Sequence, residues 1–113
     1  MKYTQLGEFE ELVMLVIGNL GKKAYGVSIK NTIEEKTNRK PSIGALHSAL
    51  HRLEKKGFID SHEGGATAIR GGRRKRYYEL SAYGKNVLQH AHDLRHNLFT
   101  QIPGLAFNRS SDE

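Results

Sequence analysis

Apolar residues recur at spacings of three and four along two stretches near the start of the chain, which is the period of an amphipathic helix. The first stretch is Leu6 to Leu20, which Gly21 ends, and the second is Ala24 to Lys36. The first helix carries so many apolar residues that we expect it to be buried on more than one side. The core-facing positions predicted in the second helix are Tyr25, Ile29 and Ile33.

A third helical stretch, Ser42 to Gly57, divides its residues between two faces. The face predicted to lie on the core is apolar and consists of Ile43, Leu46, Leu50 and Leu53. The other face is small near its start and rich in hydrogen-bond donors: Gly44, His47, Ser48, His51 and Lys55. Such a face suits a helix that enters the major groove of DNA, although on its own it is more typical of an ordinary surface helix.

After the third helix the period changes to two, which predicts strands. The two expected strands are Phe58 to Glu63 and Arg73 to Leu80, joined by the glycine-rich segment Gly64 to Gly72. Tyr78 and Leu80 share one face of the second strand, and we expect them to anchor the hairpin on the core.

A long last helix is predicted from Ala82 to Ile102, where Pro103 follows. Its apolar residues form a nearly straight seam of Val87, Ala91, Leu94, Leu98 and Ile102. A helix about 30 Å long that projects from a small domain has too little surface of its own chain to cover such a seam. We therefore expect a second copy of the chain to cover it in a homodimer.

This order of elements predicts a mainly α fold class with a small β-hairpin, namely a winged helix-turn-helix followed by a long C-terminal helix. Residues 1–80 are expected to form the winged helix-turn-helix domain. Residues 81–104 are expected to form a dimerisation helix, and residues 105–113 a polar tail.

The charge balance adds a class of partner to this picture. The 113 residues contain 18 Lys and Arg against 12 Asp and Glu, giving a net charge of +6, which favours polyanionic partners. The chain contains no cysteine, which excludes disulfides and thiolate zinc sites. An acidic N-terminal region and short apolar runs predict neither a signal peptide nor a membrane span, so we expect a cytoplasmic protein.

The strongest local charge lies between Arg70 and Arg76, where five of seven residues are cationic. A run of this kind on a glycine-rich tip, next to a donor-rich helix, favours polyanion binding over a merely solvated hairpin. The glycines allow the tip to approach a phosphate backbone closely. The arginines can pair with phosphates or enter a narrow minor groove.

Four segments carry a resemblance to a known family: LGEFEELVML from Leu6, AYGVSI from Ala24, RKPSIGALHSALHRLEKKGFI from Arg39 and GGRRKRYYELSAYG from Gly71. In this order and spacing they resemble the PadR family of transcriptional regulators, of the short type with one C-terminal helix. The resemblance covers most of residues 6–84, and the final helix matches in position and length only. It implies a homodimeric repressor that binds a pseudo-palindromic operator in double-stranded DNA. The residues themselves predict neither a cofactor nor enzymatic activity.

The resemblance also implies which residues contact DNA. The positions that correspond to a groove- or phosphate-facing recognition helix are Ser42, Gly44, His47, Ser48 and Arg52, and those of the wing are Arg70, Arg73, Arg74 and Lys75. We add the outer-face residue His51 and the basic pair Arg39 and Lys40 that leads into the helix. One departure matters, because the family commonly has tyrosine where this chain has His47. A shorter, titratable ring stands there, so the base preference of the family cannot be carried over.

Other interpretations are weaker or remain open. The pairs His47 and His51, and His92 and His96, could each offer two imidazoles to a metal, but no third ligand is evident. No ordered nucleophile and base, and no phosphate-binding or dinucleotide motif, points to an enzyme. A winged helix that binds RNA or protein instead of duplex DNA stays open. The family likeness further suggests a small-molecule effector at the dimer interface, with Leu98 and Phe99 as candidate walls.

Overall fold

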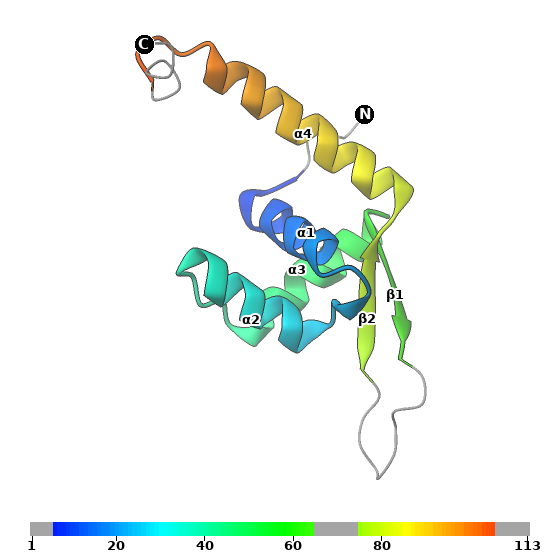
Figure 1. The fold of residues 1–113 in the computed structure, drawn as a ribbon. Coiled ribbons are helices and arrows are strands. Elements are labelled where there is room, and N and C mark those ends of the chain that lie inside the picture. The colour runs from blue at the N-terminus through cyan, green and yellow to red at the C-terminus, as the bar shows by residue number, and fades with distance from the viewer. Residues whose placement is uncertain (1–5, 65–74, 106–113) are drawn as a thin grey trace.

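The computed structural model describes residues 6–64 and 75–105, and it confirms the mainly helical fold with an antiparallel hairpin (Figure 1). The elements in chain order are α1 (Glu8–Leu20), a short 3₁₀ turn η1 (Gly21–Lys23), α2 (Gly26–Thr37), α3 (Ile43–Lys55), β1 (Ile59–Glu63), β2 (Arg76–Leu80) and α4 (Ala82–Thr100). None of these described helices is long and apolar enough to span a bilayer.

The hydrophobic core lies where α1, α2 and α3 meet the base of the hairpin. Its largest fully buried side chains come from these elements and from α4: Val13, Met14, Ile17, Ile29, Ile33, Leu46, Leu50, Leu53, Ile59 and Val87. β1 and β2 pair antiparallel, with Ile59 opposite Leu80 and Glu63 opposite Arg76. The buried Tyr78 joins the same core, as the alternation in its strand predicts.

Helix α2 begins two residues later than its periodicity predicts, for a reason that lies in the tertiary structure. The carbonyl of Ala24 accepts a hydrogen bond of 2.9 Å from the backbone N–H of Tyr78, and Tyr25 forms an isolated bridge with Tyr77. The backbone of these two residues therefore pairs with β2 in an extended conformation. Tyr25 is consequently only half-buried, and the core position predicted for it was wrong.

The ends of α3 and the start of α4 follow local chemistry. Ser42 Oγ accepts a hydrogen bond of 3.0 Å from the N–H of Ala45, and Ser81 Oγ accepts one of 2.9 Å from the N–H of Gly84. Gly57, just beyond α3, has φ of 83°, the left-handed conformation that glycine adopts at no steric cost.

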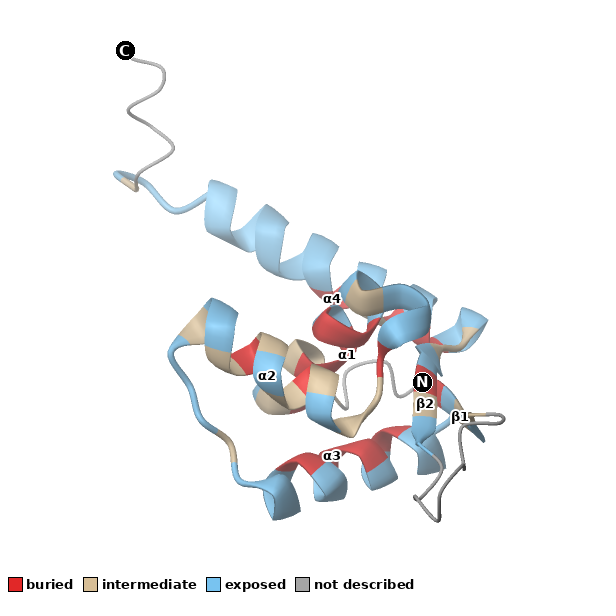
Figure 2. Cartoon of the chain, turned by 60° about the horizontal axis from the view of Figure 1, so that its bottom comes forward, coloured by how far each residue is buried: buried red, intermediate tan, exposed pale blue. Residues whose placement is uncertain are grey.

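Helix α4 leaves the domain part-way along its length. Val87 and Ala91 are buried against the chain's own core, whereas every residue from 92 to 104 is exposed. Figure 2 shows this change from buried to exposed along the helix. The regular helix ends at Thr100 and not at the predicted Ile102.

Candidate nucleic-acid interface

Helix α3 turns its donor-rich face to solvent. Its buried residues are Leu46, Ala49, Leu50 and Leu53, which all lie on one side. All the predicted groove-facing positions lie on the opposite, exposed side: Ser42, Gly44, His47, Ser48, His51 and Arg52. Figure 2 shows α3 as an outer layer with its buried side facing α1 and α2. The side chains of His47, Ser48 and His51 make no hydrogen bond to any described residue, so their donors face open solvent.

Ile43 departs from the prediction at the first position of this helix. We expected it on the core face with Leu46, but its side chain is 49% exposed, so that prediction was wrong. Ala49 takes part in the buried stripe in its place. A residue in the first turn lies beyond the edge of the neighbouring helices, so a helical period alone does not bury it.

The start of α2 lies next to the middle of this exposed face. A Cβ atom added to Gly26 would stand 4.0 Å from Cε1 of His47, an ordinary contact distance, so the start of α2 lies beside that imidazole. Ser28 does not point toward a ligand, because its Oγ accepts from the N–H of Tyr25 at 2.9 Å and donates to the carbonyl of Lys23 at 2.6 Å.

The hairpin is tied to the C-terminal part of α3 by a chain of polar side chains. Arg76 Nη1 donates to Ser61 Oγ at 2.8 Å, and Ser61 Oγ donates to Glu54 Oε2 at 2.6 Å. This links β2, β1 and α3 in turn. Burial raises the pKa of the Tyr78 hydroxyl above its ordinary 10.0; the charge of Glu54 adds to the effect and that of Arg76 opposes it.

The base of the wing carries the one wing candidate that the structure describes. Lys75 is exposed, and its Nζ lies 4.4 Å from the ring centroid of Tyr25. Tyr25 contacts Tyr77 at 5.5 Å between ring centroids, and Tyr77 stacks on His62 at 5.9 Å. The other wing candidates, Arg70, Arg73 and Arg74, lie outside the described residues.

Two other DNA-binding candidates pair with carboxylates of α1. Arg39 Nη1 lies 2.6 Å from Glu8 Oε2, and its guanidinium also lies over the Phe9 ring. Arg52 Nε lies 2.7 Å from Oε2 of Glu10. Lys40 and the pyrrolidine of Pro41 line a shallow surface hollow beside Arg39.

Glu10 is a functional candidate that the sequence analysis missed. Its carboxylate is nearly buried and accepts hydrogen bonds from Arg52, Lys56 and the backbone N–H of Gly7. Burial alone raises the pKa of Glu10, but these three donors and the charge of Lys56 outweigh it, so the pKa lies below its ordinary 4.5. The available signal was an acid three residues after a helix start, the spacing of a capping box.

The predicted dimer seam divides into two parts. Val87 is fully buried and Ala91 nearly so within a single chain, which leaves them no surface to offer a partner; their assignment to an interface is corrected accordingly. Leu94 and Leu98 are 48% and 60% exposed, and Ile102 is also exposed. Phe99 and Leu15 of α1 add further exposed apolar surface.

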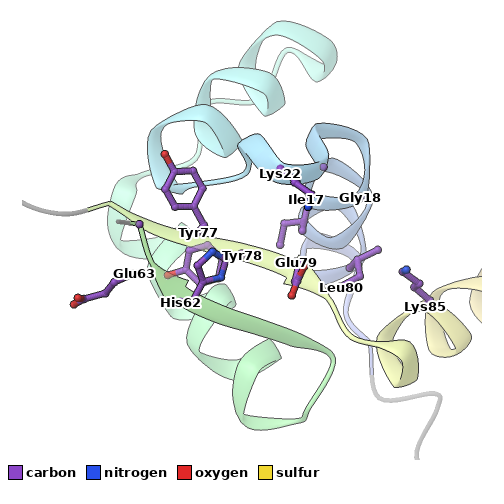
Figure 3. Close-up of a pocket in the computed structure, with 12 residues that line it drawn as sticks. Ile17, Gly18, Lys22, His62, Glu63, Tyr77, Tyr78, Glu79, Leu80 and Lys85 are labelled. Carbon is purple, nitrogen blue, oxygen red and sulfur yellow. The ribbon is translucent and has the colours of Figure 1, made fainter. Parts of the chain in front are cut away.

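A separate groove of about 600 Å³ lies between the end of α1, β2 and the start of α4 (Figure 3). Its wall includes Lys22 and Lys85 but also Glu63 and Glu79, so no sign of charge dominates. Leu98 and Phe99, the predicted effector walls, do not line it. Within residues 6–64 and 75–105, no three His, Asp or Glu side chains gather as metal ligands would.

Three helices around one core, an exposed donor-rich third helix and a hairpin beside it define a winged helix-turn-helix protein. The family model of PadR-like transcriptional regulators matches residues 13–90, which is more than half of the chain. The chain therefore belongs to the PadR-like family of transcriptional regulators, which makes DNA-binding regulation its class of function.

Solved structures agree with this fold. A PadR-like transcription factor from Bacteroides fragilis is 21% identical, with 91% of this chain and 94% of that chain covered and a TM-score of 0.75. A PadR family regulator from Clostridium difficile is 23% identical, with 81% and 92% covered and a TM-score of 0.68. One from Eggerthella lenta is 25% identical, with 82% and 80% covered and a TM-score of 0.64. No curated protein sequence matches the chain.

Proposed function

We propose that the protein is a sequence-specific repressor that binds double-stranded DNA as a homodimer on a pseudo-palindromic operator. The observation that carries this proposal is the exposed face of α3, where His47, Ser48 and His51 present donors to solvent opposite a fully apolar buried side. Unpaired donors on a helix of this width suit base edges in a major groove.

In this proposal α3 enters the major groove and the hairpin contacts the adjoining backbone. Gly44 permits close approach near the start of the helix, and His47 and Ser48 read base edges. The cations contact phosphates, which fixes the register without reading sequence: Arg39, Lys40, Arg52, Arg70, Arg73, Arg74 and Lys75.

The second copy is proposed to pack on the exposed part of α4. Leu94 and Leu98 lie on one side of a helix segment that its own chain leaves uncovered, and Ile102 is exposed just beyond the end of that helix. A two-fold arrangement would place two α3 helices in successive major grooves, about 34 Å apart. A small-molecule effector at this interface remains a further proposal, with Leu98 and Phe99 as its walls.

The direct experiment selects bound duplexes from a random pool at moderate salt and then measures affinity by fluorescence anisotropy. We expect an inverted repeat with half-sites about one helical turn apart. Contact with about eight phosphates per dimer gives a slope near −7 in a plot of log K against log salt. Equal binding to short single strands, or no enriched sequence, would instead support a module for RNA or protein.

Two sets of variants separate base reading from backbone contact. Lys75→Ala should weaken binding to all sequences about equally and lower the salt slope by about one per contacted phosphate. The double change Arg73→Ala and Arg74→Ala should act in the same way. His47→Ala or Ser48→Ala should instead change which sequence the selection enriches. Identical behaviour of both sets would contradict these roles.

A further inference from the structure

We infer that Glu10 of α1 is a positioning residue for DNA binding, which holds the guanidinium of Arg52 so that its outer nitrogens face a backbone phosphate. The inference rests on the proposed function, since it gives Arg52 a phosphate contact. The inference goes beyond that function because it assigns a role in DNA binding to Glu10, which lies on α1 and not on α3 and is itself shielded from solvent.

The geometry around Glu10 shows how this carboxylate is held. Its side chain is only 8% exposed, and its two oxygens have separate partners. Oε2 accepts from Arg52 Nε at 2.7 Å, while Oε1 accepts from Lys56 Nζ at 3.0 Å and from the N–H of Gly7 at 3.1 Å. A carboxylate with so many charge-assisted donors is fixed in one position, and it can therefore fix its partners.

Arg52 uses only part of its donor set in this contact. A guanidinium has five N–H donors in a planar fork, and Glu10 engages the Nε edge. No described residue accepts a hydrogen bond from Nη1 or Nη2, and the side chain is 51% exposed. These two nitrogens therefore remain available to an anion on a guanidinium whose Nε edge Glu10 already holds.

The position of Arg52 on α3 suits the binding of an anion by its guanidinium. Residue 52 lies on the exposed side of α3, one residue after His51 and four after Ser48, and so flanks the face proposed to enter the groove. Binding must remove the rotamer freedom of a free arginine side chain, which costs affinity. Arg52 has part of that freedom removed before DNA arrives, which favours binding.

The negative charge of Glu10 could also weaken DNA binding, and this opposite expectation makes the inference testable. A carboxylate close to DNA repels phosphate, so its loss would tighten binding if charge alone mattered. Neutralising Glu10 in Glu10→Gln keeps the size and an acceptor oxygen but removes the charge. Positioning predicts that binding weakens, by about fivefold, although the protein becomes more positive.

The experiment measures duplex affinity and its salt dependence for wild type, Glu10→Gln, Arg52→Ala and the double variant. Glu11→Gln is the matched control, because it makes the same charge change one residue away at the Arg95 ion pair. We expect Glu11→Gln to bind like wild type or slightly tighter. We expect Arg52→Ala to cost far less in the Glu10→Gln background than in wild type, with the salt slope reduced in both single variants.

A purely structural role for Glu10 would lower the unfolding midpoint but leave the two mutational effects on affinity additive, and this outcome would overturn the inference. Tighter binding by Glu10→Gln would overturn it as well. Should Glu10→Gln not fold, Arg52→Lys supplies the second test. Lysine keeps the positive charge, but its single ammonium lacks the several N–H donors with which a guanidinium contacts a carboxylate and a phosphate together. The affinity of Arg52→Lys for duplex DNA should therefore fall. An affinity equal to that of wild type would refute a positioning role for Glu10. Failure of wild type to bind duplex DNA would be a failure of the proposed function instead.

Discussion

Glu10 is the charged residue that is buried among the described residues, and its ionisation connects folding with α3. Periodicity did not reveal it, because an acid in the first turn of a helix is also favoured by the helix dipole alone. Ile43 was misplaced for a related reason, since the end of a helix can extend past its neighbours. His47, Ser48 and His51 were predicted correctly as exposed, because the apolar stripe opposite them is unambiguous.

The lowered pKa of Glu10 predicts a loss of stability in acid. A carboxylate whose pKa is depressed by folding stabilises the native state above its ordinary pKa of 4.5, and this contribution is lost as pH falls through the lower folded value. We expect the free energy of unfolding of wild type to exceed that of Glu10→Gln near neutral pH, and the difference to shrink steadily below about pH 4.5. Urea denaturation at a series of pH values measures this. Parallel curves for the two proteins would show that Glu10 carries no such linkage.

At the scale of elements, the first turn of α1 joins three other parts of the fold. Glu8 pairs with Arg39 before α3, Glu10 with Arg52 on α3, and Glu11 with Arg95 on α4 at 3.2 Å. The pair of Glu8 and Arg39 is exposed on both sides, so it contributes little to stability, whereas the Glu11 side chain is only 16% exposed. All three ion pairs start from the first turn of α1, so this turn connects the proposed DNA-binding helix with the proposed dimerisation helix.

The docking of α4 on the hairpin base depends on a glycine. A Cβ at Gly84 would stand 1.9 Å from the carbonyl oxygen of Phe58, which is backbone and cannot move aside cheaply. Gly84→Ala should therefore destabilise the protein by about 3 kcal/mol or more, measured by chemical denaturation followed by circular dichroism.

Gly44→Ala is the matched control for that change, since it also adds one methyl group to a helix. Nothing lies within 4 Å of a Cβ built at Gly44, so its stability should stay the same or rise by up to about 1 kcal/mol. Equal stability of the two variants would mean that α4 does not contact Phe58 as described.

For the whole molecule, the notable feature is the exposed apolar stripe of α4, formed by Leu94 and Leu98, which a single chain does not cover. Leu94→Asp should convert a proposed dimer to monomers, because a dimer would bury an unpaired charge there. The fold of each monomer should persist, since Leu94 is 48% exposed in the single chain. Sedimentation velocity at micromolar concentration measures the change.

His96→Asp is the control, because it introduces the same charge on an exposed residue of the same helix, on the side away from the apolar stripe. It should leave the proposed dimer intact. A dimeric Leu94→Asp, or a monomeric wild type, would exclude this stripe as the interface.

The sequence by itself determined the order of elements, most buried positions of the helices and the caps at Ser42 and Ser81, because each depends on neighbours within a few residues. Tertiary structure alone decided what depends on distant partners. Pairing of Ala24 with β2 keeps this residue out of α2, which therefore begins later than its periodicity predicts. Packing on the core covers Val87 but not Leu94. It also brings Glu10 to Arg52 across 42 positions of the chain, a contact that local periodicity cannot encode.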